Sequence, residues 1–205
     1  MPKILAGEFR SRSLQTLPGV ELTRPILSRV KESVFGMLHE WFDGARVLDL
    51  FAGVGTVGLE AVSRGACDVL MVERDAKVFR VLQQNIELLN CSDRAKAIQA
   101  DALAQTCLMR APQPVDLVFV DPPYSLMRDE GSRQRVLDQI GRCRPIMGDK
   151  GFVVLRSPLG PEEIDLSIDG FVGPEPHQYR KDMWALLYEP AQKTACSEPG
   201  DVMPG

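Results

Sequence analysis

The chain has 205 residues, of which 44% are hydrophobic and 25% charged, which is typical of one soluble globular domain with short attachments. Its net charge of −4 and isoelectric point of about 5.3 argue, taken whole, against a nucleic-acid partner, which needs a basic surface. No apolar run reaches the ~18 residues of a membrane span, and no signal peptide is evident at Met1-Pro2-Lys3. We therefore expect a cytoplasmic monomer without membrane contact.

Cysteine and histidine usage excludes further classes of protein. The five cysteines are scattered and form no Cys-x-x-Cys pair: Cys67, Cys91, Cys107, Cys143 and Cys196. A disulfide scaffold or a zinc site is therefore not expected. His39 and His177 are the only histidines, which excludes a histidine-rich metal site, and no metal is expected.

Short apolar runs alternate with helical patterns along the chain, which predicts an α/β fold with a mostly parallel sheet. A small hairpin is expected in residues 3–17, followed by a helix that Ser28 caps and that continues to Trp41. Strands are expected at 47–51, 69–72, 97–100, 117–120 and 152–155, with helices at 56–64, 76–89 and 133–143. Two later strands, near 168–172 and 183–188, have no helix pattern between them and should pair antiparallel. The residues after Pro190 predict a disordered tail.

The first candidate site is the Gly-rich segment from Asp49 to Gly58, which follows an apolar strand and opens a helix. Gly53, Gly55 and Gly58 match the dinucleotide pattern G-x-G-x-x-G. Glycines let a ligand approach the backbone, and a helix N-terminus favours negative charge. A tight strand-to-helix turn without a ligand would carry the same glycines, so both interpretations remain open.

Acidic residues follow four successive apolar runs: Asp49, Glu73, Asp101 and Asp121. In open α/β sheets, ligands bind at the carboxyl ends of the strands. Four carboxylates there suit a ligand with a ribose, an amine and a positive centre. S-adenosylmethionine, a sulfonium with an amino-acid tail, fits better than a pyrophosphate. Each acid alone could instead cap a helix, and this is the preferred interpretation of Asp75.

The third motif is Asp121-Pro122-Pro123-Tyr124, directly after the fourth strand. Consecutive prolines make the backbone rigid and remove two N–H donors. A carboxylate and a carbonyl can then accept both hydrogen bonds of a planar –NH2 group while an aromatic ring stacks on the base. A rigid turn with Tyr124 on the surface is the simpler alternative.

Together these motifs resemble the class I S-adenosylmethionine-dependent methyltransferases that act on amines. More narrowly, the chain is similar to the RsmD-type bacterial enzymes, which methylate guanine-N2 at position 966 of 16S rRNA. The resemblance spans roughly residues 3–189 and includes an N-terminal pattern: Gly7-x-x-Arg10-x-Arg12-x-Leu14, Arg24-Pro25, Arg29-Val30-Lys31-Glu32 and Phe35. The chain departs from the family's pattern at four places: Ser11, where glycine is usual, Ile26, Ser28 and Leu155-Arg156-Ser157, which lacks a glutamate.

The resemblance implies a Rossmann-like fold with a seven-stranded, mostly parallel sheet, helices on both faces, an antiparallel edge and a small N-terminal hairpin. It divides the chain into a basic hairpin at 1–20, a methyltransferase domain at 21–189 and a tail at 190–205. The implied cofactor-binding residues are Asp49, Phe51, Ala52, Gly53, Gly55, Glu73, Arg74, Asp101 and Ala102. The implied catalytic residues, which hold the amine and stack on guanine, are Asp121, Pro122, Pro123 and Tyr124.

The resemblance also implies a set of basic residues facing 16S rRNA or the assembling 30S subunit: Arg10, Arg12, Arg24, Arg29 and Lys31. Each of these alone is equally well explained as solvated surface. Residues 1–31 carry six basic and two acidic side chains, a charge of +4 that leaves −8 on the remainder. The sequence therefore predicts a basic N-terminal face beside an acidic cofactor cleft. Removing residues 1–20 is expected to abolish RNA methylation and spare cofactor binding.

Three alternative functions remain open. An adenine-N6 methyltransferase acting on RNA or DNA would use the same Asp-Pro-Pro-Tyr motif. An NAD-dependent oxidoreductase could use the Gly-rich loop, although Asp49 ahead of the loop and the lack of a hydride-transfer constellation disfavour it. A non-catalytic RNA-binding module could retain the same fold.

Overall fold

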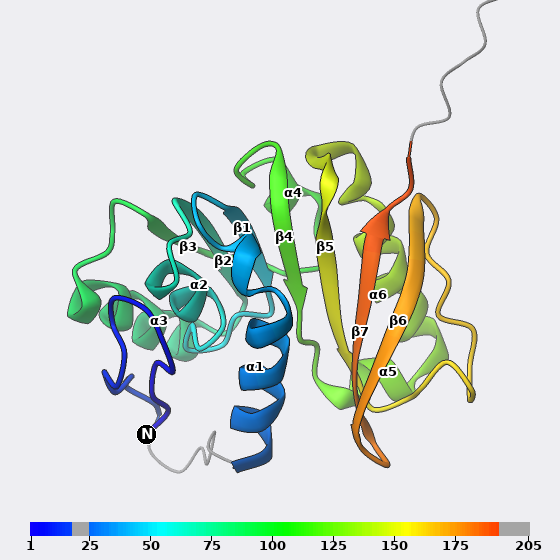
Figure 1. Ribbon diagram of the computed structural model, residues 1–205, viewed down its shortest axis with the longest axis horizontal. Helices are drawn as coiled ribbons and strands as arrows, with labels where there is room; N and C mark the ends of the chain where they lie inside the picture. The colour runs from blue at the N-terminus through cyan, green and yellow to red at the C-terminus, as the bar shows by residue number, and fades with distance from the viewer. Residues whose placement is uncertain (18–24, 193–205) are drawn as a thin grey trace, which may run out of the picture.

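A seven-stranded sheet runs through the middle of the computed structural model, which describes residues 1–17 and 25–192. In chain order the strands are β1 (Arg46–Leu50), β2 (Asp68–Glu73), β3 (Ala95–Gln99), β4 (Val115–Val120), β5 (Met147–Ser157), β6 (Phe171–Arg180) and β7 (Met183–Pro190). They lie in the order β3-β2-β1-β4-β5-β7-β6 (Figure 1). The first five strands are parallel, and β7 and β6 form an antiparallel edge. The predicted fold class is confirmed.

Helices cover both faces of this sheet, and their buried side chains form two separate apolar clusters. One face carries α1 (Pro25–Met37), α2 (Gly58–Ser63) and α3 (Ala76–Leu89). The other carries α4 (Gln105–Leu108), α5 (Tyr124–Arg128) and α6 (Glu130–Gly141), so α1 and α6 lie on opposite sides in Figure 1. Short 3-10 turns follow α1 (His39–Trp41) and α6 (Arg144–Ile146). In the part of the chain described, no helix combines the length and hydropathy that crossing a membrane requires.

The first helix differs from its prediction at both ends. It begins at Pro25 rather than at Ser28, because proline lacks only an N–H that the first helical turn would leave unpaired. It ends at Met37, and Trp41 lies in the following 3-10 turn. Asp75 caps α3 as expected, because its carboxylate accepts the N–H groups of Lys77 and Val78.

The prediction for the sixth strand is wrong in position: the sequence predicts a strand near 168–172, and β6 runs from Phe171 to Arg180. Its sequence is polar and contains Pro174 and Pro176, which argue against a central strand. An edge strand tolerates proline, and β6 pairs only with β7, through a ladder that is irregular at two points. Sequence patterns also missed the short helices α4 and α5.

The N-terminal segment, residues 1–17, packs into the same core as the sheet. One antiparallel bridge, between Lys3 and Ser13, makes it a minimal hairpin. Ile4, Phe9 and Leu14 are buried with side chains of α1, α2 and α3. The expected tail lies outside the described residues beyond position 192, as does Cys196.

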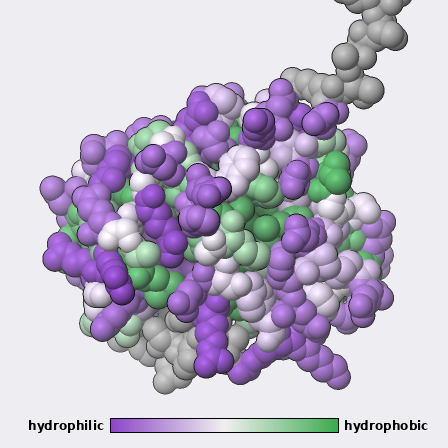
Figure 2. Space-filling view, viewed as in Figure 1, coloured by the Kyte–Doolittle hydropathy of each residue, from purple (hydrophilic) through white to green (hydrophobic). Residues whose placement is uncertain are grey.

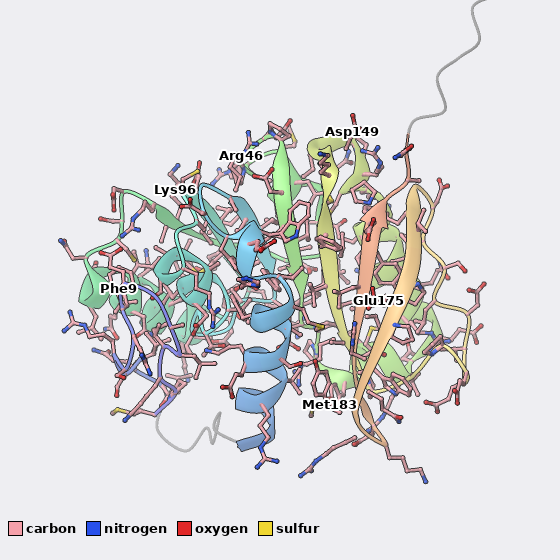
Figure 3. All side chains as sticks on the ribbon, in the orientation of Figure 1. Phe9, Arg46, Lys96, Asp149, Glu175 and Met183 are labelled. Carbon is pink, nitrogen blue, oxygen red and sulfur yellow. The ribbon has the colours of Figure 1, made fainter. Side chains whose placement is uncertain are left out.

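The amino-terminal edge of the sheet carries paired surface charges, which Figure 3 shows at Arg46, Lys96 and Asp149. Arg46 lies 3.1 Å from Asp116 and Lys96 lies 3.3 Å from Asp68. Ion pairs at the surface contribute little to stability. They lie far along the strands from the carboxyl ends, where the candidate site is found.

Candidate active site

The Gly-rich loop between β1 and α2 turns sharply over residues 51–57. Phe51 and Gly53 have φ angles of +65° and +58°, a region that non-glycine residues occupy at an energetic cost. A Cβ atom at Gly53 would meet nothing within 4 Å, so this face of the backbone is open to a ligand. At Gly58, a Cβ atom would lie 2.6 Å from Met71, so this glycine allows α2 to pack against β2. The loop combines an open turn with a close-packed helix start.

Two carboxylates hold this loop in place. Asp49 Oδ2 accepts the N–H of Gly58 at 2.9 Å, and Glu73 Oε2 accepts the N–H of Gly53 at 3.0 Å. The other oxygen of Glu73 accepts the N–H of Asp75 at 2.7 Å. Glu73 therefore joins the end of β2 to the loop, and its remaining lone pairs are those a ribose could use.

Asp49 is almost completely buried beneath the loop, with 1% of its surface exposed. Burial raises the pKa of its carboxyl to about 8, against the opposing effect of the Gly58 hydrogen bond, and the charges of Asp121 and Glu73 act in the same direction as burial. A cation bound nearby would stabilise the ionised carboxylate. The Asp49 environment therefore favours a positively charged ligand over a pyrophosphate.

A cavity of about 300 Å³ opens above the loop at the carboxyl ends of β1, β2 and β4. It is lined by six of the predicted cofactor residues: Phe51, Ala52, Gly53, Glu73, Arg74 and Ala102. Asp49 and Gly55 are buried in and under the loop. Asp101 is exposed, and its carboxylate accepts the N–H of Leu103 at 2.9 Å in a local turn. Of these two adjacent residues, Ala102 lines the cavity, and Asp101 is not among its lining residues.

The Asp-Pro-Pro-Tyr segment closes one end of this cavity, since Asp121, Pro122 and Pro123 line it. The N–H of Asp121 reaches the carbonyl of Leu50 at 3.4 Å, so the segment is attached to β1. Burial raises the pKa of the Asp121 carboxyl, and the guanidinium of Arg156 acts against this rise. Tyr124 begins α5.

Arg156, on β5, contacts this motif directly. Its Nε donates a hydrogen bond to Asp121 Oδ1, and its Nη1 lies 3.5 Å from the hydroxyl of Tyr124. Its guanidinium carbon lies 5.0 Å from the centre of the Tyr124 ring. A cation thus covers part of the ring that was expected to stack on guanine.

A second cavity of about 180 Å³ lies between α1 and the strands β4, β5 and β7. Its walls are mostly apolar: Val30, Val34, Phe35, Phe119 and Val154. In the same orientation as Figure 1, Figure 2 shows an apolar area over β5 and β7, one of several apolar areas on a largely hydrophilic face. Thr56, Asp121 and Arg156 line both cavities, so the two spaces adjoin at these three residues.

The predicted RNA-facing residues have different surroundings. Arg10, Arg12 and Arg29 are exposed, whereas Arg24 lies outside the described residues. Lys31 is largely buried, and its ammonium lies 3.1 Å from Glu60 and 3.2 Å from the carbonyl of Thr56. Burial lowers the pKa of Lys31, and Glu60 acts against this. Lys31 is therefore better placed to support the wall of the second cavity than to meet a phosphate.

Sequence reasoning missed two buried polar residues that connect the N-terminal segment to the site. Glu60, on α2, is fully buried and accepts the N–H groups of Leu5 and Ala6 at 2.8 and 3.1 Å. Asn85, on α3, donates to the carbonyl of Val54 at 2.9 Å and pairs with the backbone of residue 15. The sequence signal that could have identified them is a polar residue on the apolar face of each helix.

The sequence is similar to those of several proteins named as ribosomal RNA methyltransferases. A Haemophilus influenzae protein named "Ribosomal RNA small subunit methyltransferase D" is 39% identical over 127 residues, which are 60% of this chain and 63% of that protein. The Escherichia coli K12 protein of the same name is 35% identical over 122 residues, 60% of each chain. The matched region therefore spans less than two thirds of these curated relatives.

Solved structures match over more of the chain. The Escherichia coli yhhF structure gives a TM-score of 0.76 at 25% identity and covers 92% of this chain and 97% of that one. A Synechocystis magnesium protoporphyrin IX methyltransferase with bound SAM gives a TM-score of 0.62 at 15% identity, with 86% and 87% covered, which concerns the fold alone.

The sheet order and the cavity at its carboxyl edge define a class I methyltransferase fold. The model of one family, described as conserved hypothetical protein 95, matches residues 2–172. The chain belongs to this family. The expected relationship to RsmD-type, S-adenosylmethionine-dependent rRNA methyltransferases is confirmed at the level of the family.

Proposed function

We propose that the protein transfers a methyl group from S-adenosylmethionine to the exocyclic N2 amine of a guanine in 16S rRNA, guanine 966 by analogy with the RsmD-type enzymes. The observation that carries this proposal is that Asp121 lines both cavities. One cavity is lined by the Gly-rich loop and strand-end acids, and the other by apolar side chains suited to a flat base. An acceptor for an amine lies where they join.

The larger cavity fits S-adenosylmethionine by the chemistry of its lining. Glu73 is placed to accept ribose hydroxyls, Ala102 to contact the adenine, and the loop at Gly53 to pass close to the methionine part. Asp49 and Asp121 contribute negative charge toward a cationic centre. When bound, this cofactor supplies a methyl group that is activated for transfer because it is bonded to a positively charged sulfur.

The chain's own contribution to chemistry centres on the target amine. The lone pair of guanine N2 is delocalised into the ring, which makes the nitrogen a poor nucleophile. An Asp121 oxygen and the Pro122 carbonyl, by accepting its two protons, favour a tetrahedral nitrogen whose lone pair is free to attack. The proton that the methylated nitrogen releases would leave to water, with Asp121 a secondary acceptor. Alignment of the reactants supplies much of the rate.

The proposed substrate is 16S rRNA, free or in an assembling 30S subunit. Its target base leaves the stack to enter the smaller cavity, which costs less in a loop or bulge. Arg10, Arg12 and Arg29 are exposed, Arg29 directly precedes Val30 in the wall of this cavity, and all three are proposed to contact RNA phosphates. We further propose that residues 21–189 form the catalytic unit, that residues 1–20 contribute the basic face, and that the protein acts as a cytoplasmic monomer.

Substitution of Asp121 tests this function directly. Asp121→Asn should reduce transfer of labelled methyl to undermethylated 30S particles by at least about 100-fold, because the amide offers a weaker acceptor and an unwanted donor. S-adenosylmethionine affinity, measured by calorimetry, should fall far less than methyl transfer does, because Glu73, Ala102 and the Gly-rich loop are unchanged, and NAD titrated in the same way should not bind. Asp149→Asn, at the opposite edge of the sheet, is the matched control and should keep full turnover. Near-normal transfer by folded Asp121→Asn would contradict the proposal.

A further inference from the structure

Arg156 stands beside Asp121 because of the strand register. Val120 on β4 pairs with Leu155 on β5, so the next residue on each strand, Asp121 and Arg156, lie side by side at the carboxyl edge. Both line both cavities. The Arg156 side chain is 23% exposed and that of Asp121 is 35% exposed, so the pair is partly shielded from water.

The guanidinium is restrained at two points. Its Nε donates to Asp121 Oδ1, its Nη1 lies 3.5 Å from the hydroxyl of Tyr124, and its Cζ lies over the Tyr124 ring at 5.0 Å from the ring centre. A guanidinium held by a carboxylate and an aromatic ring has a defined orientation, which a more flexible ammonium would lack. Arg156 therefore restrains the rotation of the Asp121 carboxylate about its Cβ–Cγ bond.

We propose that Arg156 is a positioning residue for the amine transfer: it occupies Oδ1 of Asp121, so that Oδ2 and the Pro122 carbonyl form the acceptor pair for the target –NH2. This inference rests on the proposed function. The amine needs two acceptors in a fixed relation, and a freely rotating carboxylate provides that relation only part of the time. Tyr124 then acts partly by holding Arg156, since the guanidinium covers its ring.

The arrangement also concerns the charge of Asp121. Burial raises the pKa of this carboxyl and Arg156 lowers it, so removing the guanidinium leaves the carboxylate harder to ionise. Other titratable or charged groups that line the same cavities or act on this pair are Asp49, Glu73, Arg74, Tyr124, Lys3 and Lys31. Arg156 is the one with a direct hydrogen bond to Asp121 among the residues the structure describes.

The test compares Arg156→Gln, Arg156→Lys and the control Arg128→Gln in methyl transfer to 30S particles across a pH series. Arg128 also lies over the Tyr124 ring, at 5.8 Å, but its ion-pair partner is the exposed Asp182. Arg156→Gln should lower kcat more than it raises KM for RNA, and should move the acid limb of kcat upward by about one to three pH units. Arg156→Lys should restore the position of the limb but only part of kcat. Arg128→Gln should match the wild type.

The possible results distinguish a failure of the positioning role of Arg156 from a failure of the proposed function. An unchanged acid limb in Arg156→Gln, with an active wild type, would overturn the positioning role and leave the proposed function standing. A rise in kcat would also overturn it, because Arg156 would then compete with the amine for Asp121. A wild type that transfers no methyl to RNA would instead refute the proposed function. Melting temperature and S-adenosylmethionine affinity, measured on each variant, should stay close to wild type. If Arg156→Gln fails to fold, Arg156→Met, which has an unbranched and uncharged side chain, takes its place and should show the same pH shift.

Discussion

Asp49 illustrates how a single buried side chain serves both the fold and the proposed site. Its carboxyl lies under the Gly-rich loop, bonded to the start of α2, with two further carboxylates nearby. Because burial raises its pKa to about 8, it is mostly protonated at neutral pH in the free protein. Binding of a cation beside it would favour ionisation, so ligand binding and proton release should be coupled.

Asp49 should give stability a distinctive pH dependence. Its pKa is higher in the folded than in the unfolded chain, so the folded state holds the extra proton, and stability falls as pH rises from about 5 toward 8. The slope should approach about −1.4 kcal/mol per pH unit. Asp49→Asn should remove that slope, as measured by urea unfolding at several pH values. Parallel curves for the two proteins would contradict the assignment.

At the scale of elements, the N-terminal segment is part of the core rather than a detachable hairpin. It buries three apolar side chains and provides two backbone N–H donors to the buried carboxylate of Glu60, which also pairs with Lys31 and Arg64. Its removal would leave that carboxylate short of partners, at a high energetic cost. We therefore expect deletion of residues 1–20 to destabilise the fold, and point substitutions are the better test of its role with RNA.

Gly7 packs closely against Ser63, the last residue of α2. It has a φ of +81°, and a Cβ atom there would lie 1.7 Å from the carbonyl oxygen of Ser63. Gly7→Ala should therefore lower the free energy of unfolding by at least about 2 kcal/mol, measured by urea denaturation. Gly36→Ala is the control: a Cβ atom meets nothing within 4 Å in α1, so it should stabilise by about 0.5–1 kcal/mol. Equal effects of the two changes would contradict this packing.

Sequence patterns predicted the parallel strands and α3 well because apolar periodicity reports burial directly. They failed where a residue's partner is distant in sequence. The polar strand β6 follows from its edge position, and Glu60 and Asn85 are hydrogen-bonded in part to a segment more than 50 residues away. Ser11, noted as a departure from glycine, has a φ of +68°, which shows why glycine suits that turn. The sequence pattern indicates only that the segment around Arg156 lacks the family's glutamate. The contact of Arg156 with Asp121 follows from the register of β4 and β5.

At the scale of the whole molecule, charge is distributed between the two ends of the sheet. The amino-terminal edge carries exposed ion pairs, whereas the carboxyl edge gathers Asp49, Glu73 and Asp121 around the cavities. Exposed arginines lie on the N-terminal segment and on α1, on the same face of the sheet as the smaller cavity. The net charge of −4 therefore does not exclude a local group of basic residues on that face.

Removing two of these arginines should weaken RNA binding without affecting the fold. Arg10→Gln with Arg12→Gln should reduce the slope of log affinity against log salt by about 0.7–0.9 for each phosphate that the protein no longer neutralises. The measurement is fluorescence anisotropy with a labelled 16S rRNA fragment. Lys96→Gln, at the opposite edge of the sheet, removes the same type of charge and should leave the slope unchanged. An equal effect of both changes would point to net charge rather than to a defined RNA face.

The central claim is methyl transfer to a guanine N2 in small-subunit RNA, and mapping of the product tests it most directly. The wild-type protein would be given labelled S-adenosylmethionine and 30S particles from a strain lacking this modification, and the RNA would be digested and analysed by mass spectrometry. We predict one methyl per particle, on the N2 amine of a single guanine, and none with Asp121→Asn. A methyl group on adenine N6, or no incorporation by the folded wild-type protein, would contradict this claim.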